Sequence, residues 1–116
     1  MKKFALRFWH PVRGIMYALR NDSAIQIEVF FGTIALIVLH FLFGPFSPAA
    51  QLLLLFCFLL VLITEFQNSA IEVALDKLHP ERHESIGISK DLAAASVIFA
   101  AIFSLISLIF VLTGQI

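Results

Sequence analysis

The chain has 116 residues, 60% of them hydrophobic, and its mean hydropathy is +0.97. Soluble domains contain about 45–50% apolar residues, so this composition excludes an ordinary soluble domain and predicts a protein of the lipid bilayer. Eight basic and eight acidic residues give a formal net charge of zero, which does not suggest nucleic-acid binding. The length predicts one domain over residues 1–116. Cys57 is the only cysteine, which excludes an intramolecular disulfide.

Residues 2–21 are predicted to form an amphipathic helix on the membrane surface. Apolar side chains cover about 140° of its helical wheel; they are Phe4, Ala5, Phe8, Trp9, Val12, Ile15, Met16 and Leu19. The basic residues occupy the remainder of the wheel together with His10 and Tyr17; they are Lys2, Lys3, Arg7, Arg13 and Arg20. Pro11 either interrupts this helix or starts its second half. A disordered basic leader is the alternative, and no long apolar stretch follows that would indicate a cleavable signal peptide.

Three membrane spans are predicted, at about 24–43, 49–78 and 88–113. Twenty residues at 1.5 Å each extend about 30 Å, which is the thickness of the hydrocarbon core. The sequence Asn21-Asp22-Ser23 forms a cap-like break before the first span, the 44–48 segment GPFSP forms a turn, and His79-Pro80 ends the second span. Small residues at the start of the third span favour close helix packing; they are Ala93, Ala94, Ala95, Ser96, Ala100 and Ala101.

The basic residues predict the orientation of these spans. All eight lie in residues 2–20 or 77–90, and none lies in the 44–48 turn or after residue 91. By the positive-inside rule, the N-terminus and the 77–91 connection face the cytoplasm, and the C-terminus faces outward.

A stripe of polar side chains continues from the apolar half of the second span. Glu65, Asn68, Glu72, Asp76 and His79 fall within about 80° of arc on a helix. Such a stripe is costly beside an apolar segment unless a cation meets it, so it predicts a metal ion, often one that carries phosphates. The simpler alternative is a set of solvated charges on a helix extension beyond the membrane.

The sequence contains no Walker A motif, no dinucleotide fingerprint and no protein-kinase signature. It does contain Glu65-Phe-Gln-Asn68-Ser-Ala-Ile-Glu72-x-x-x-Asp76, then Glu81-Arg-His-Glu84, and then Gly87-Ile-Ser-Lys90-Asp91. Together with the upstream block Gly14-x-x-x-Ala18-x-x-Asn21-Asp22-x-Ala24, this pattern resembles the bacterial diacylglycerol kinase family, which includes the undecaprenol kinases. The resemblance covers residues 2–112.

The resemblance implies an all-α integral membrane protein of the bacterial cytoplasmic (inner) membrane. It implies a homotrimer with composite sites, which uses Mg²⁺ and ATP to phosphorylate a lipid hydroxyl. Diacylglycerol is the expected acceptor, with undecaprenol as the alternative. The sequence departs from the family pattern at Asp22, where Glu is usual, and at Gln67, where Leu is usual.

The resemblance also implies roles for single residues. Glu65 corresponds to the general base, Asn68 to a donor for the transferring phosphoryl group, and Asp22 and Glu72 to magnesium ligands. The implied nucleotide contacts are Lys3, His10, Asp22, Glu72, Asp76, Glu81, Arg82, His83, Lys90 and Asp91. The implied lipid contacts are Ala24, Glu28, Glu65 and Ala94. Glu28 has a simpler alternative role as a helix-start carboxylate or the partner of a basic side chain.

A non-enzyme is the competing class: a proton-coupled transporter or a small accessory subunit. Carboxylates in membrane helices do mark proton paths. Here, however, the acids gather at one end of the second span, and residues 49–64 hold no charge. This asymmetry favours chemistry at one membrane surface over conduction across it.

Overall fold

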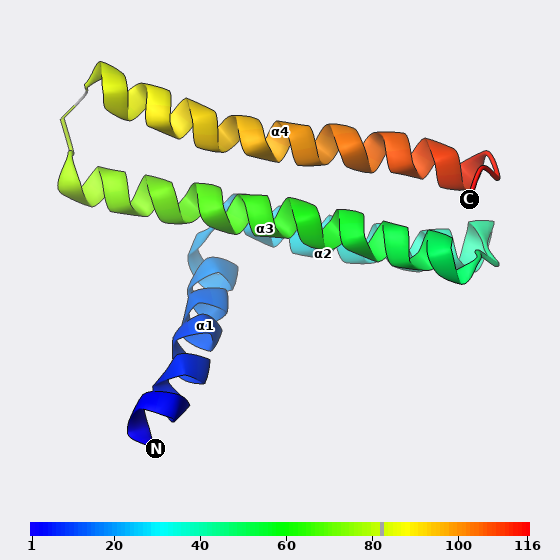
Figure 1. Ribbon diagram of the computed structural model, residues 1–116, viewed down its shortest axis with the longest axis horizontal. Coiled ribbons are helices and arrows are strands. Elements are labelled where there is room, and N and C mark those ends of the chain that lie inside the picture. Colours follow the sequence, from blue (N-terminus) through cyan, green and yellow to red (C-terminus); the bar gives the residue numbers. More distant parts are fainter. Residues whose placement is uncertain (82) are drawn as a thin grey trace.

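The computed structural model describes residues 1–81 and 83–116, and its regular elements are helices (Figure 1). In chain order they are α1 (Lys2–Asn21), α2 (Ser23–Val38), a short π-helix η1 (Leu39–Phe43), α3 (Pro48–Leu78) and α4 (Glu84–Leu112). Three stretches are long and apolar enough to cross a membrane: Ser23–Phe43, Pro48–Leu78 and Glu84–Leu112. The predicted all-helical fold, with one N-terminal helix and three spans, is confirmed.

Helix α1 is continuous over its 20 residues, with Pro11 inside it. Both the predicted interruption at Pro11 and the disordered leader are therefore wrong. A proline removes only one backbone hydrogen bond, and the missing donor is tolerable on an exposed helix. Figure 1 shows α1 running across the direction of the other helices, which is how a surface helix lies relative to membrane spans.

Local sequence signals set the helix ends. The Ser47 hydroxyl accepts a hydrogen bond from the backbone N–H of Ala50 at 3.1 Å, and Pro48 occupies the first turn of α3. Helix α3 ends at Leu78, directly before His79-Pro80, as predicted. Helix α4 begins at Glu84, four residues before the predicted start at 88, because the His83 imidazole caps it by accepting from the Ser85 backbone N–H at 3.2 Å.

Helices α3 and α4 form an antiparallel hairpin, which is the most extensive helix pair in the fold (Figure 1). On α4, Ala93, Ala100 and Ser107 are buried at intervals of seven residues, and Val111 is buried one turn further along. Two of the small residues predicted to favour close packing therefore lie at buried positions. On α3, the buried positions follow the 3.6-residue period; they are Ala50, Leu54, Cys57 and Val61.

Helix α2 packs on α3, and the two helices approach closely at Gly32. A Cβ atom added to Gly32 would overlap the ring of Phe58 and would lie 3.4 Å from a carboxylate oxygen of Glu28. Gly32 therefore permits this contact because it has no side chain. Most other large apolar side chains of the spans remain exposed on the isolated chain.

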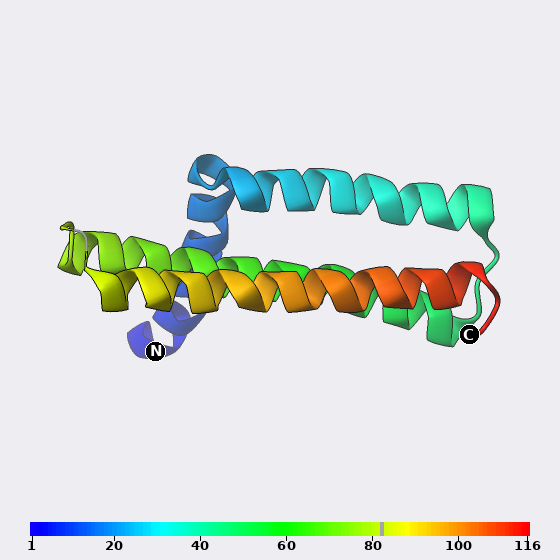
Figure 2. The same ribbon diagram turned by 90° about the horizontal axis from the view of Figure 1, so that it is seen from above.

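The polar segments gather at one end of the bundle. Figures 1 and 2 show α1 and the connection between α3 and α4 towards one end, and the C-terminus and the turn before α3 at the other. Figure 1 also shows the α3–α4 hairpin extending beyond the level of α1. If α1 marks the membrane surface, the polar ends of α3 and α4 project past that surface into water.

Candidate functional site

The junction between α1 and α2 is organised by Asp22. One carboxylate oxygen of Asp22 accepts a hydrogen bond from the backbone N–H of Ile25 at 3.1 Å, so Asp22 is the N-cap of α2. Ile25 is fully buried at this junction. The Gln26 amide donates to the Leu19 carbonyl at 2.9 Å, which links α2 back to α1. The predicted cap-like break is therefore confirmed, and Asp22 is held in a defined place.

The second carboxylate oxygen of Asp22 accepts a hydrogen bond from the Ser69 hydroxyl on α3. Both residues are partly buried. Sequence reasoning missed Ser69: it stands inside the motif Asn68-Ser69-Ala70-Ile71-Glu72, but the sequence gives no indication of its partner on another helix. Because Ser69 precedes Glu72 by three residues, Asp22 is joined to the same region of α3 that carries Glu72.

The acidic stripe of α3 changes in exposure along its length. Glu65 is partly buried at the end of the apolar segment, whereas Glu72 and Asp76 are exposed. Ser69, which holds Asp22, stands four residues after Glu65 and three before Glu72, so the Asp22 carboxylate meets α3 between these two acidic positions.

Asn68 lies one helical turn from Glu65, and its side chain is partly buried. Its amide oxygen is buried and accepts no hydrogen bond from the described residues. A buried acceptor without a partner costs about 1–3 kcal/mol, so this oxygen favours an external donor or cation.

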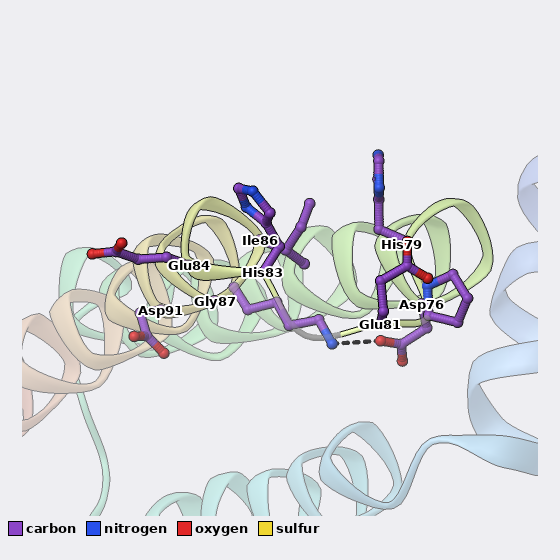
Figure 3. Close-up of a pocket in the computed structure, with 10 residues that line it drawn as sticks. Asp76, His79, Glu81, His83, Glu84, Ile86, Gly87 and Asp91 are labelled. Atoms are coloured by element: carbon purple, nitrogen blue, oxygen red, sulfur yellow. Dashed lines mark hydrogen bonds and ion pairs between the residues drawn. The ribbon is translucent and has the colours of Figure 1, made fainter.

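A pocket of about 540 Å³ lies where α3 ends and α4 begins (Figure 3). Its lining includes five of the predicted nucleotide contacts: Asp76, Glu81, His83, Lys90 and Asp91. The Lys90 ammonium group forms an ion pair across the hairpin with the Asp76 carboxylate, marked by the dashed line in Figure 3. The structure thus brings these five residues to one pocket, in which Lys90 is already paired with Asp76.

The other predicted site residues lie elsewhere. His10 lines a separate groove of about 350 Å³ that includes Tyr17 on α1 and Val73 on α3. Lys3 lies near the N-terminal end of α1, which Figure 1 shows far from the hairpin. Arg82 is outside the described residues. Among the predicted lipid contacts, Ala24 and Ala94 are exposed, whereas Glu28 lines a 160 Å³ crevice with residues of α2, α3 and α4.

The donor set fits magnesium in its chemistry. The described residues contain no group of three acidic, histidine or cysteine side chains arranged around one point. Magnesium is commonly held by one or two carboxylates together with substrate phosphates and water, so it needs no such group. Asp22 and Glu72 carry carboxylate oxygens, which are the type of ligand that this ion prefers.

The chain is similar to known proteins over most of its length. The family model for prokaryotic diacylglycerol kinase matches residues 9–112. The diacylglycerol kinase of Haemophilus influenzae is 36% identical over 91 residues, which are 78% of this chain and 75% of that protein. The diacylglycerol kinase of Escherichia coli K12 is 32% identical over 95 residues, which are 82% of this chain and 76% of that protein.

Proposed function

This chain belongs to the prokaryotic diacylglycerol kinase family and is a lipid kinase, and we propose that it transfers the γ-phosphoryl group of ATP to the hydroxyl of diacylglycerol, with Mg²⁺ as cofactor. One observation carries the proposal: the hairpin pocket and the partly buried Glu65 lie along the same helix, α3. Such an arrangement suits a nucleotide that arrives from water and a lipid that arrives from the membrane.

The hairpin pocket is the proposed nucleotide site. Lys90 is suited to offset phosphate charge, and its present partner Asp76 is 66% exposed, so the ion pair can be exchanged at little cost. Glu81 and His83 line the same pocket and are suited to contact the adenosine. Phosphoryl transfer depends mainly on positioning and charge, so these side chains are chemically sufficient without a Walker A loop.

Glu65 is the proposed general base. Its carboxylate accepts the proton of the lipid hydroxyl while the hydroxyl oxygen forms a bond to the γ-phosphorus. The bond from that phosphorus to the β–γ bridging oxygen breaks, and ADP leaves. The Asn68 amide group donates to the transferring phosphoryl group, and its unsatisfied oxygen is available to a substrate donor.

Asp22 and Glu72 are the proposed ligands of the magnesium ion, which supplies neutralisation of the phosphate charge when it is bound. The hydrogen bond between Ser69 and Asp22 supports this pairing, because it fixes Asp22 beside the turn of α3 that carries Glu72. Asp is one methylene group shorter than the Glu that is usual in the family. The contact with Ser69 accounts for how the shorter side chain is held here.

We propose that the active form is a homotrimer whose sites combine residues of neighbouring copies. Within one chain, Lys3 and His10 lie away from the hairpin pocket, so a second copy would have to bring such residues to it. The exposed apolar surface of the spans is available for contacts with other copies and with lipid. The proposed location is the bacterial cytoplasmic membrane, with the N-terminus in the cytoplasm.

The purified protein in detergent, supplied with ATP and Mg²⁺, provides the test. We expect ATP consumption only when a lipid alcohol is added, and faster consumption with diacylglycerol than with undecaprenol. Faster turnover of undecaprenol would replace the proposed acceptor with the alternative one. An absence of lipid-dependent ATP consumption with either alcohol would contradict the proposal and favour the non-enzymatic class.

A further inference from the structure

A groove on α1 adjoins the one that His10 lines and shares Arg13 and Tyr17 with it. It has a volume of about 380 Å³ and is lined by Trp9, Arg13, Met16, Tyr17, Arg20 and Asn21. Trp9 and Tyr17 are 52% and 54% exposed, and both arginines are also exposed. The groove therefore combines two guanidinium groups with two aromatic rings on an open surface.

The helical wheel places this groove at the edge of the apolar face. At 100° per residue, the five lining positions from Trp9 to Arg20 fall within about 100° of arc. Trp9 and Met16 lie on the apolar face, and Arg13 and Arg20 lie just beyond its edge. When the apolar face of α1 is in the bilayer, these arginines reach the depth of the lipid headgroups.

The two arginines are available for a ligand. Among the residues that the structure describes, neither Arg13 nor Arg20 forms an ion pair or a side-chain hydrogen bond. Guanidinium groups bind phosphate oxygens in a bidentate manner, and Trp and Tyr side chains are enriched at the interface between headgroups and acyl chains.

We propose that this groove binds the phosphate of an anionic phospholipid headgroup, with Arg13 and Arg20 as phosphate ligands, Trp9 beside the upper acyl chains and Tyr17 at the level of the headgroup. The charge of the groove complements such a headgroup, and its mixed polar and apolar lining matches the junction of headgroup and chain. The proposal does not depend on the kinase assignment, because it concerns binding alone.

Trp9 is the only tryptophan in the chain, so its fluorescence reports on this groove. The full-length protein is placed in phosphatidylcholine bilayers that contain some phosphatidylglycerol, with bromine atoms on the acyl chains of one lipid or the other. Bromine quenches tryptophan on contact, so the two quenching levels give the relative affinity for each lipid. We expect roughly fivefold or greater preference for phosphatidylglycerol, because each basic residue near an anionic surface contributes about a fivefold factor in affinity.

The Arg13→Gln/Arg20→Gln variant should lose this preference. The matched control is Arg7→Gln/Lys77→Gln, which removes two positive charges outside the groove and should keep the preference. High salt should weaken the preference of the unaltered protein, which tests the charge contribution without a substitution.

Three results would overturn the proposal: equal quenching by both lipids, equal loss of preference in both double variants, or a preference that salt does not change. Added inorganic phosphate distinguishes a lipid headgroup from a free anion as the ligand. We expect no displacement of the lipid by phosphate at millimolar levels, and full displacement would contradict the assignment to a lipid.

Discussion

The hydroxyl of Ser69 donates a hydrogen bond to the carboxylate of Asp22, across 47 positions of sequence and between α3 and the α1–α2 junction. Asp22 also caps α2. Its side chain therefore fixes both the first residue of α2 and the position of α2 against α3. The surface helix, the first span and the acidic stripe are thereby joined at one point.

The first prediction concerns this hydrogen bond. Ser69→Ala leaves a partly buried carboxylate without its hydroxyl donor, and hydrogen bonds to charged groups contribute roughly 1.5–3 kcal/mol. We expect a loss of unfolding free energy in that range, measured by thermal or denaturant unfolding in detergent micelles. Ser96→Ala is the matched control, because Ser96 is also partly buried and donates only to the Ala93 carbonyl of its own helix. Equal destabilisation by both substitutions would show that the contact between helices contributes nothing.

The second prediction concerns Glu65 as the base. Glu65→Gln keeps the size of the side chain and removes its ability to accept a proton. General-base catalysis typically contributes about 10²–10⁴-fold, so kcat should fall at least about a hundredfold while ATP affinity stays nearly unchanged. Single-turnover kinetics and equilibrium nucleotide binding measure the two quantities separately. Lost nucleotide binding with turnover retained at saturating ATP would instead make Glu65 a ligand.

The third prediction concerns Glu72 as a metal ligand. Glu72→Gln removes a charge from an exposed position of α3, so its effect on folding should be small. We expect a large loss of activity, weaker binding of Mg-ATP, and a higher magnesium concentration for half-maximal activity. Titrations of activity and of ATP binding against magnesium check this. Unchanged metal dependence would remove Glu72 from the site.

The fourth prediction concerns the ion pair of Asp76 and Lys90. The two side chains are 66% and 35% exposed, so breaking the pair should change stability by less than about 1 kcal/mol. Lys90→Gln should nevertheless raise the KM for ATP strongly, because it removes the cation that we propose offsets the charge of the nucleotide phosphates. A large loss of stability with an unchanged KM would make the pair a structural contact instead of part of the nucleotide site.

The fifth prediction concerns orientation. The basic residues that the structure describes lie at the end of the bundle that carries α1 and the connection from α3 to α4, so this end should face the cytoplasm. Reporter domains fused to the two termini should report a cytoplasmic N-terminus and an external C-terminus. Both termini on one side would contradict the three-span topology.

Much of the fold could be predicted from the sequence because the signals are local. The apolar stretches locate the three spans, and the breaks at Asp22 and His79-Pro80 follow from capping and proline chemistry. Boundaries that depend on a side-chain cap are harder to predict: the start of α4 was misplaced because His83 caps the helix with its imidazole ring.

The sequence predicts those features of the site that depend on single residues or on spacing within one helix, but not the contacts between helices. The stripe on α3 follows from helical spacing, and the family resemblance named five of the residues that line the hairpin pocket. The contact between Ser69 and Asp22 depends on the packing of separate helices, and no spacing in the sequence encodes that distance. For the same reason, the place of His10 in a different groove could not be foreseen.

Helix α3 extends without interruption over 31 residues and carries Glu65, Glu72 and Asp76 at fixed heights. At 1.5 Å per residue, Glu72 stands about 10 Å and Asp76 about 16 Å further along the axis than Glu65. A change in bilayer thickness therefore moves all three carboxylates together relative to the headgroups, because the helix cannot shorten between them. With Glu65 as the proposed base, the match between this helix and the membrane sets the depth at which a lipid hydroxyl must reach it, and we expect the reaction rate to depend on membrane thickness.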